Sequence, residues 1–112
     1  MKRYLVIYHA SVSAAAQMAT ATPEQAREGM AAWMQWARKM APAIVELGAP
    51  LGSTVSFAAP HVRGEVASSI AGYSVLQAEN HDDLAAVLGG HPHFRAPGAS
   101  IVVHEMLSLP GL

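Results

Sequence analysis

Hydrophobic positions divide the chain into four predicted strands and two predicted helices. Residues 4–8 form a dense block of aromatic, β-branched and aliphatic side chains, which indicates a buried first strand. Apolar runs and alternation predict three further strands. The second strand covers residues 53–58 and the last covers residues 101–107. The third begins between residues 65 and 70 and is clearest at residues 73–78.

The helix between the first two predicted strands has a strong start signal. Thr22 is the expected N-cap, a proline occupies the first helical position, and Gln25 can complete a capping box. Pro42 is expected to kink the helix, but the apolar pattern continues to a glycine stop, so we predict one bent helix ending near Leu47. Gly29 inside the helix suggests a close approach of neighbouring backbone or of a ligand, with packing against backbone as the favoured explanation. The predicted core stripe is Ala26, Met30, Trp33, Ala37 and Met40.

The second helix is predicted to begin after Asn80, which can cap it, and to end at Gly89-Gly90. Its buried side is expected to carry Leu84, Val87 and Leu88. Residues 10–21 are rich in alanine without a clear period, so we expect a loop there, with at most a short helical turn capped by Ser13.

This order of elements predicts an α+β domain. Strand, helix, strand, strand, helix, strand is the ferredoxin-like βαββαβ pattern with an antiparallel sheet, and no linker or repeat divides residues 1–112 into further domains. Side-chain alternation separates two sets on the first and third strands. We expect Leu5, Ile7, Ser74, Leu76 and Ala78 to lie under the helices and Tyr4, Val6, Tyr8, Tyr73, Val75 and Gln77 to face a partner's sheet, with the reverse assignment as the alternative.

Composition favours a self-associating protein. Of the 112 residues, 52% are hydrophobic and only 13% charged, so we expect a homodimer or higher oligomer that hides an apolar face. The net charge of −1, with no run of basic residues, argues against nucleic-acid binding. No apolar run approaches membrane-spanning length and none resembles a secretory signal, so we predict a cytoplasmic protein without membrane contact.

The histidines are the candidate site. In the expected topology the end of the first strand, the turn between the second and third strands and the exit of the second helix share one edge, which brings together His9, His61, His91 and His93. Imidazole titrates near neutral pH, so His91 and His93 are candidate general acids or bases and His9 an orienting group or second base. The simpler alternative is that these rings only hydrogen-bond backbone in a crowded loop region.

Other chemistry has little support in the sequence. A His91-x-His93 pair with a third imidazole can bind a divalent metal, but without a cysteine or a defined third ligand we predict no metal site. His104 and Glu105 are adjacent in a strand and point to opposite faces. No phosphate-binding glycine motif or nucleophile elbow is present, and we predict no cofactor.

Five segments together resemble the YCII-related family of dimeric α+β-barrel proteins over essentially the whole chain. They are KRYLVIYHA, TPEQAREGMAAWMQWARKM, ELGAPLG, GYSVLQAENHDDLAAVLGGHPHF and IVVHEM. The subgroup that the chain most resembles has His-Pro-His where other YCII-like proteins have Asp-Pro-Phe, so His91 stands where those proteins have an acid. A catalytic His-Asp dyad has been proposed for YCII-like proteins, but the first helix here contains no histidine, and only the position of His91 is carried over.

The resemblance implies a ferredoxin-like protomer whose sheet packs on the sheet of a partner, with a cleft beside each sheet. Our first functional hypothesis is a homodimeric protein that binds a small organic molecule in a histidine-lined cleft and uses acid/base catalysis. The alternative is a non-catalytic ligand-binding or regulatory module, with a metal-dependent site as a third hypothesis. Fold alone does not decide among them.

Overall fold

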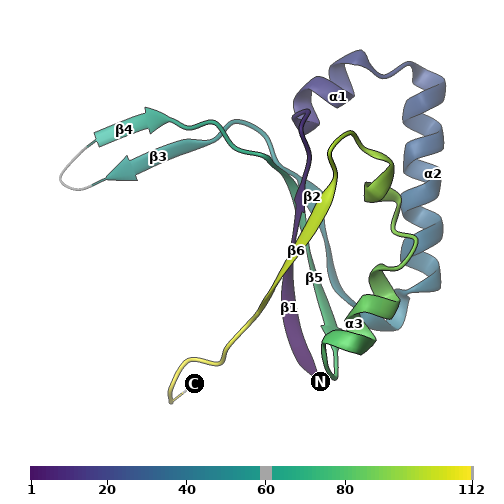
Figure 1. Ribbon diagram of the computed structural model, residues 1–112, viewed down its shortest axis with the longest axis vertical. Helices are drawn as coiled ribbons and strands as arrows, with labels where there is room; N and C mark the ends of the chain where they lie inside the picture. The colour runs from purple at the N-terminus through teal and green to yellow at the C-terminus, as the bar shows by residue number, and fades with distance from the viewer. Residues whose placement is uncertain (59–61, 112) are drawn as a thin grey trace.

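The computed structural model describes residues 1–58 and 62–111, which contain both helices and strands (Figure 1). In chain order the elements are β1 (Lys2–His9), α1 (Ala14–Thr20), α2 (Pro23–Lys39), a 3₁₀ turn η1 (Ala41–Ala43), β2 (Ile44–Pro50), β3 (Val55–Ala58), β4 (Val62–Glu65), β5 (Ile70–Ala78), α3 (His81–Leu88), a 3₁₀ turn η2 (Pro92–Arg95) and β6 (Ser100–Glu105).

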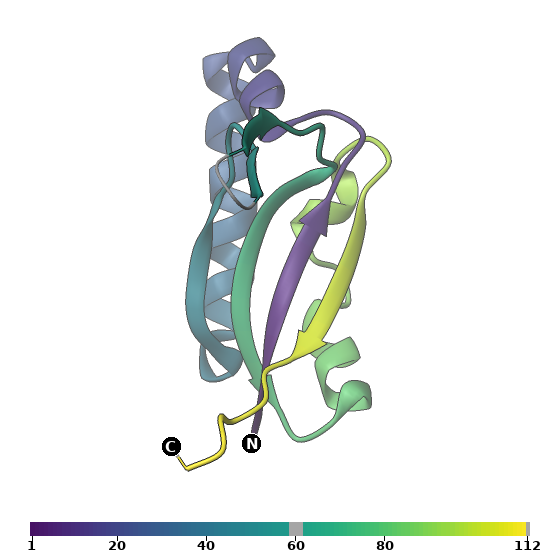
Figure 2. The ribbon, with the colours of Figure 1, turned by 90° about the vertical axis from the view of Figure 1, so that its left-hand side faces the viewer.

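Four of the strands form one antiparallel sheet in the order β2-β5-β1-β6. Helices α2 and α3 cover one face of this sheet, and the view in Figure 2 shows the other face uncovered. The predicted α+β class with an antiparallel sheet is therefore confirmed. Over the described part of this single chain, the sheet does not close into a barrel.

The helix starts are confirmed by their capping contacts. The Thr22 hydroxyl accepts a hydrogen bond from the Gln25 backbone N–H while the Gln25 side chain accepts one from the Thr22 N–H, which completes the predicted capping box. Asn80 caps α3 through the backbone N–H of Asp83. Ser13 caps the short helix α1 in the same way. These local signals could be predicted because each uses residues only three positions apart.

The predicted extension of the first helix to Leu47 is wrong. Helix α2 ends at Lys39, Pro42 lies in the following 3₁₀ turn, and residues 44–50 form strand β2. The apolar residues after Pro42 include the β-branched pair Ile44-Val45, and pairing with β5 satisfies their backbone groups better than a helix that has lost its N–H at the proline. Pro42 thus stops the helix.

A two-stranded hairpin, β3–β4, takes the place where we predicted the second strand of the main sheet. Its strands pair with each other and belong to a sheet of their own, and the hairpin projects away from the rest of the molecule (Figure 1). The alternation at 53–58 did indicate a strand, but the partner of that strand was wrongly assigned. The main sheet still has the predicted four strands, because β2, which we predicted as helix, occupies the position expected for the strand at residues 53–58.

Each face of the sheet carries residues from both of the side-chain sets that we predicted for β1 and β5. The helix-covered face carries the buried residues Tyr4, Val6, Tyr8, Ser74, Leu76 and Ala78. The prediction was right for β5 but wrong for β1, whose residues Leu5 and Ile7 lie on the open face opposite Val75 and Tyr73. Alternation fixes the two faces of one strand, whereas matching the faces of two strands needs their register.

Only the second half of the predicted stripe on α2 reaches the core. Trp33, Ala37 and Met40 pack on the core together with the buried Trp36, whereas Met30 is 63% exposed because this end of the helix extends past the sheet. A Cβ added to Gly29 would meet nothing within 4 Å, so no close approach explains that glycine.

Candidate functional site

The chain leaves α3 through Gly89-Gly90 and brings His91 and His93 against the end of β1. Gly90 has φ of 73°, a left-handed conformation that glycine adopts without strain, and this turn redirects the chain into η2. His91 is 2% exposed and His93 is 7% exposed, both on the helix-covered side of the sheet beside Tyr8. The predicted approach of these histidines to the end of the first strand is thus observed.

Four hydrogen bonds in this buried region link five groups in a chain with a defined direction. The backbone N–H of His93 donates to Nδ1 of His91 at 2.9 Å. Because Nδ1 is then an acceptor, the proton of the neutral imidazole lies on Nε2, which donates to the Tyr8 hydroxyl at 3.2 Å. Tyr8 donates to Ser74 Oγ at 2.7 Å, and Ser74 donates to the Leu47 carbonyl at 2.6 Å. Every donor in this hydrogen-bond chain therefore has an acceptor.

Three aromatic rings enclose His91. Its ring centroid lies 4.3 Å from Trp36, 4.6 Å from Trp33 and 5.0 Å from Tyr8. Burial in these surroundings, with repulsion from His93 as a smaller contribution, lowers the pKa of His91 from 6.5 to about 4. Burial likewise raises the pKa of Tyr8 to about 12, although its bond to Ser74 acts in the opposite direction. At neutral pH the His91 imidazole and the Tyr8 hydroxyl are therefore both uncharged.

His9 belongs to the same end of the molecule but to the opposite face of the sheet. His93 Nε2 donates to the backbone carbonyl of His9 at 2.8 Å, from the helix-covered side. The imidazole of His9 lies on the open face, where its Nδ1 is 2.7 Å from Ser69 Oγ. The three predicted site residues are therefore linked through the backbone of β1, and their side chains do not converge on one cavity.

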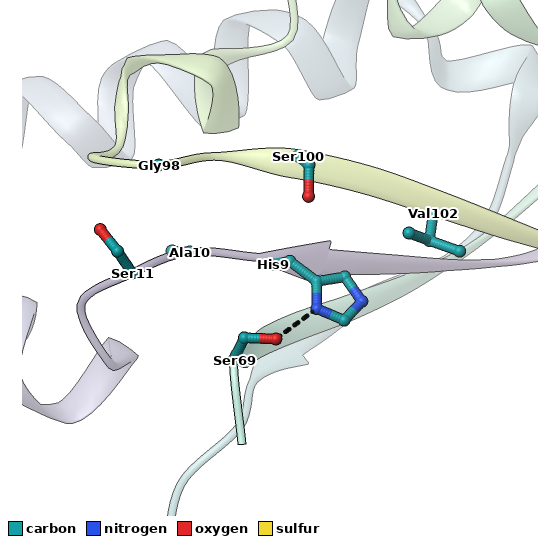
Figure 3. A pocket seen from close by; sticks show the side chains of 7 residues that line it. All are labelled: His9, Ala10, Ser11, Ser69, Gly98, Ser100 and Val102. Carbon is teal, nitrogen blue, oxygen red and sulfur yellow. Dashed lines mark hydrogen bonds between the residues drawn. The ribbon is translucent and has the colours of Figure 1, made fainter. Parts of the chain in front are cut away.

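A pocket of about 310 Å³ opens beside His9 (Figure 3). It lies between the end of β1 and the start of β6, with the loop before β5 on its other side. Hydroxyl groups and one imidazole supply most of its hydrogen-bonding capacity, and Val102 supplies an apolar wall. The lining residues are His9, Ala10, Ser11, Ser69, Gly98, Ser100 and Val102.

Of the histidines that the structure describes, His104 does not extend this site. His61, predicted to join it, lies outside the described residues. His104 is on the open face further along β6, opposite Leu5, and Glu105 is on the other face, as expected for neighbours in a strand. Among residues 1–58 and 62–111, no three His, Asp or Glu side chains gather closely enough to hold a metal ion.

Sequence reasoning missed the residues that surround the histidines. Tyr8 and Ser74 are polar groups on the buried side of central strands, and such a position is a usable signal once the register is known. Ser69 precedes β5 and Ser100 begins β6, and neither belongs to a distinguishing sequence pattern. Only the pairing of His9 with Ser100 and the hydrogen bond between His9 and Ser69 bring them together.

Comparison with known proteins adds no assignment, because no protein-family model and no curated protein matches this chain. In the part of the chain that the structure describes, no helix is both long and apolar enough to cross a lipid bilayer.

Proposed function

We propose that this chain is a YCII-like, ferredoxin-like protomer that forms a homodimer through its open sheet face and binds a small organic molecule in the pocket beside His9. Two features support the fold assignment. The strand order β2-β5-β1-β6, with helices on one face only, is that of a split βαβ domain. The uncovered face carries the half-exposed apolar residues Leu5 and Ile7, which a second sheet would bury.

The pocket beside His9 is the observation that carries the ligand proposal. Its volume of about 310 Å³ lies at the small end of the range for ligand sites, which suits a molecule of several to a dozen heavy atoms. Serine hydroxyls and an imidazole can bind a carboxylate, carbonyl or hydroxyl group, while Val102 contacts an apolar part of the ligand.

Within this proposal the histidines have different roles. His9 is half-exposed and lines the pocket, so it is the group placed to exchange a proton with a bound ligand. His91 and His93 are buried on the far side of β1 and act as positioning residues. His91 fixes the Tyr8 hydroxyl, and His93 fixes the backbone of His9 through its carbonyl.

Titration with benzoate, and with benzamide as its neutral analogue, tests the ligand proposal. In ¹H–¹⁵N correlation spectra, the expected shifts are confined to the amides of the residues that line the pocket. His9→Ala should weaken benzoate binding at least tenfold. His104→Ala is the matched control, because His104 lies on the same face outside the pocket. Shifts spread over the surface, or none at 10-fold molar excess over millimolar protein, would refute the proposal.

A non-catalytic binding module is the second candidate. It is favoured by the absence of any carboxylate, lysine or arginine among the residues that line the pocket in the described part of the chain. His9→Gln keeps a hydrogen-bonding side chain that cannot accept a proton at neutral pH. Under the enzyme hypothesis, this variant binds the ligand but does not turn it over. Under the module hypothesis, the wild type shows no turnover of the same ligand either.

A further inference from the structure

The β3–β4 hairpin, here called the arm, stands out from the rest of the molecule (Figure 1). Every described residue of β3 is exposed, Phe57 at 76%, and apart from the pairing between its two strands no element packs extensively on it in the described residues. An isolated two-stranded hairpin is at best marginally stable in water. The radius of gyration of 15.8 Å exceeds the roughly 13 Å of a compact domain of this length, as a projecting arm would cause.

The arm points to the side that the helices leave free. In Figure 1 the sheet stands between α2 on one side and the arm on the other, and Figure 2 looks onto the open face from the side of the arm. The arm leaves the sheet at the end where β2 stops and β5 begins. A partner molecule that packs on the open face would therefore lie next to the arm.

A second apolar segment borders the same face at its other end. The chain after β6, residues 106–109, here called the tail, bends to the side of the arm (Figure 1). Within it Leu107 is 81% exposed and Leu109 66% exposed. The apolar residues of the arm and the tail expose on the order of 600 Å², against about 800 Å² per partner in a standard interface. The contributing residues are Val55, Phe57, Met106, Leu107 and Leu109.

We propose that the arm is an intersubunit clasp, in which Phe57 of each protomer packs on the tail of a second copy of this chain. A two-fold dimer makes such a contact twice, once at each end of the paired sheets. The tail suits the arm because both are apolar. The end of the sheet at which the arm begins instead presents the hydroxyl-lined pocket, so a contact between arm and arm would place Phe57 near serines. The proposal rests on the homodimer proposed above and identifies its contacts.

Cross-linking tests this arrangement directly, because the chain contains no cysteine. Phe57→Cys and Leu107→Cys, made in separate chains that carry tags of different size, are mixed, allowed to exchange and oxidised. The expected main product is the mixed disulfide. Met18→Cys replaces Leu107→Cys in the control, because Met18 is 69% exposed on α1, away from the open face. This control pair should yield at least tenfold less product.

Sedimentation velocity supplies the second measurement. Phe57→Ser should raise the dimer dissociation constant at least tenfold, whereas Met18→Ser should change it less than twofold. A Phe57→Ser dimer as tight as wild type, or a predominance of Phe57-to-Phe57 disulfides, overturns the clasp and leaves the proposed homodimer standing. A monomeric wild type overturns both. Benzoate titration of Phe57→Ser tests ligand binding separately from either result.

Discussion

Acid should destabilise this protein through one buried imidazole. His91 is 2% exposed, and the chain of hydrogen bonds around it requires the neutral form with its proton on Nε2. The pKa of His91 falls from 6.5 to about 4 on folding because burial disfavours the imidazolium. Between these two values the unfolded chain binds a proton at this residue and the folded chain does not. Stability is therefore complete above pH 6.5 and decreases as the pH falls towards 4.

The size of the effect follows from the two pKa values. Each unit of difference is worth about 1.4 kcal/mol, so the full shift corresponds to about 3 kcal/mol of unfolding free energy lost between pH 6.5 and pH 4. A domain of this size has a total of roughly 5–15 kcal/mol. One histidine thus accounts for a substantial part of the stability margin in mild acid.

Urea unfolding at pH 7.0, 5.5 and 4.5 measures this loss, with His91→Gln and His104→Gln as a matched pair. Removing His91 should flatten the dependence on pH, whereas removing the exposed His104 should leave it as in wild type. Long-range ¹H–¹⁵N spectra of the wild-type imidazoles report the tautomer and the pKa directly, so the test remains decisive if His91→Gln does not fold. A ring that titrates near 6.5, or carries its proton on Nδ1, would refute the reasoning.

Three further substitutions, two of them with a matched control, test the fold by urea unfolding. Tyr8→Phe should lower the free energy of unfolding by about 2 kcal/mol, because the buried Nε2–H of His91 loses its acceptor. Tyr73→Phe, on the open face, should lower it by less than about 0.5 kcal/mol. Equal losses would contradict the buried hydrogen-bond chain through Tyr8. Gly48→Ala should cost about 2 kcal/mol or more, because Gly48 has φ of 83° and an added Cβ would overlap the Tyr73 carbonyl oxygen. Gly29→Ala should instead stabilise by about 1 kcal/mol, since nothing lies near the added methyl group; a loss would mean that an unseen partner approaches α2. Asn80→Ala should cost about 1 kcal/mol through the lost cap, and no change in urea midpoint would contradict its role.

The accuracy of prediction from sequence depends on how far apart the interacting residues are. Capping at Thr22 and Asn80 was predicted correctly because the partner of each cap lies three residues away. Strand β2 was missed because its apolar pattern after Pro42 fits a helix as well as a strand, and only pairing with β5 decides between them. The hairpin partner of β3 was missed for the same reason.

The candidate site shows the same limit. The topology brought His9, His91 and His93 to one end of the molecule, and that expectation needed only the direction of the strands. It could not say that His9 faces one side of the sheet while the other two lie on the opposite side. Tyr8, which joins His91 to Ser74, appeared only as part of an alternating set whose face was wrongly assigned.

Strand β1 separates His9, on the open face, from His91 and His93, on the helix-covered face, and so connects the buried hydrogen bonds to the pocket. Tyr8 and His9 are adjacent in an extended strand, so their side chains leave on opposite faces while sharing one peptide unit. From the helix-covered side, His91 holds the side chain of Tyr8 through its hydroxyl, and His93 holds the backbone of His9 through its carbonyl. We infer that a change at His91 alters the placement of the His9 imidazole without contacting the ligand. His91→Gln should therefore weaken benzoate binding, but less than His9→Ala does.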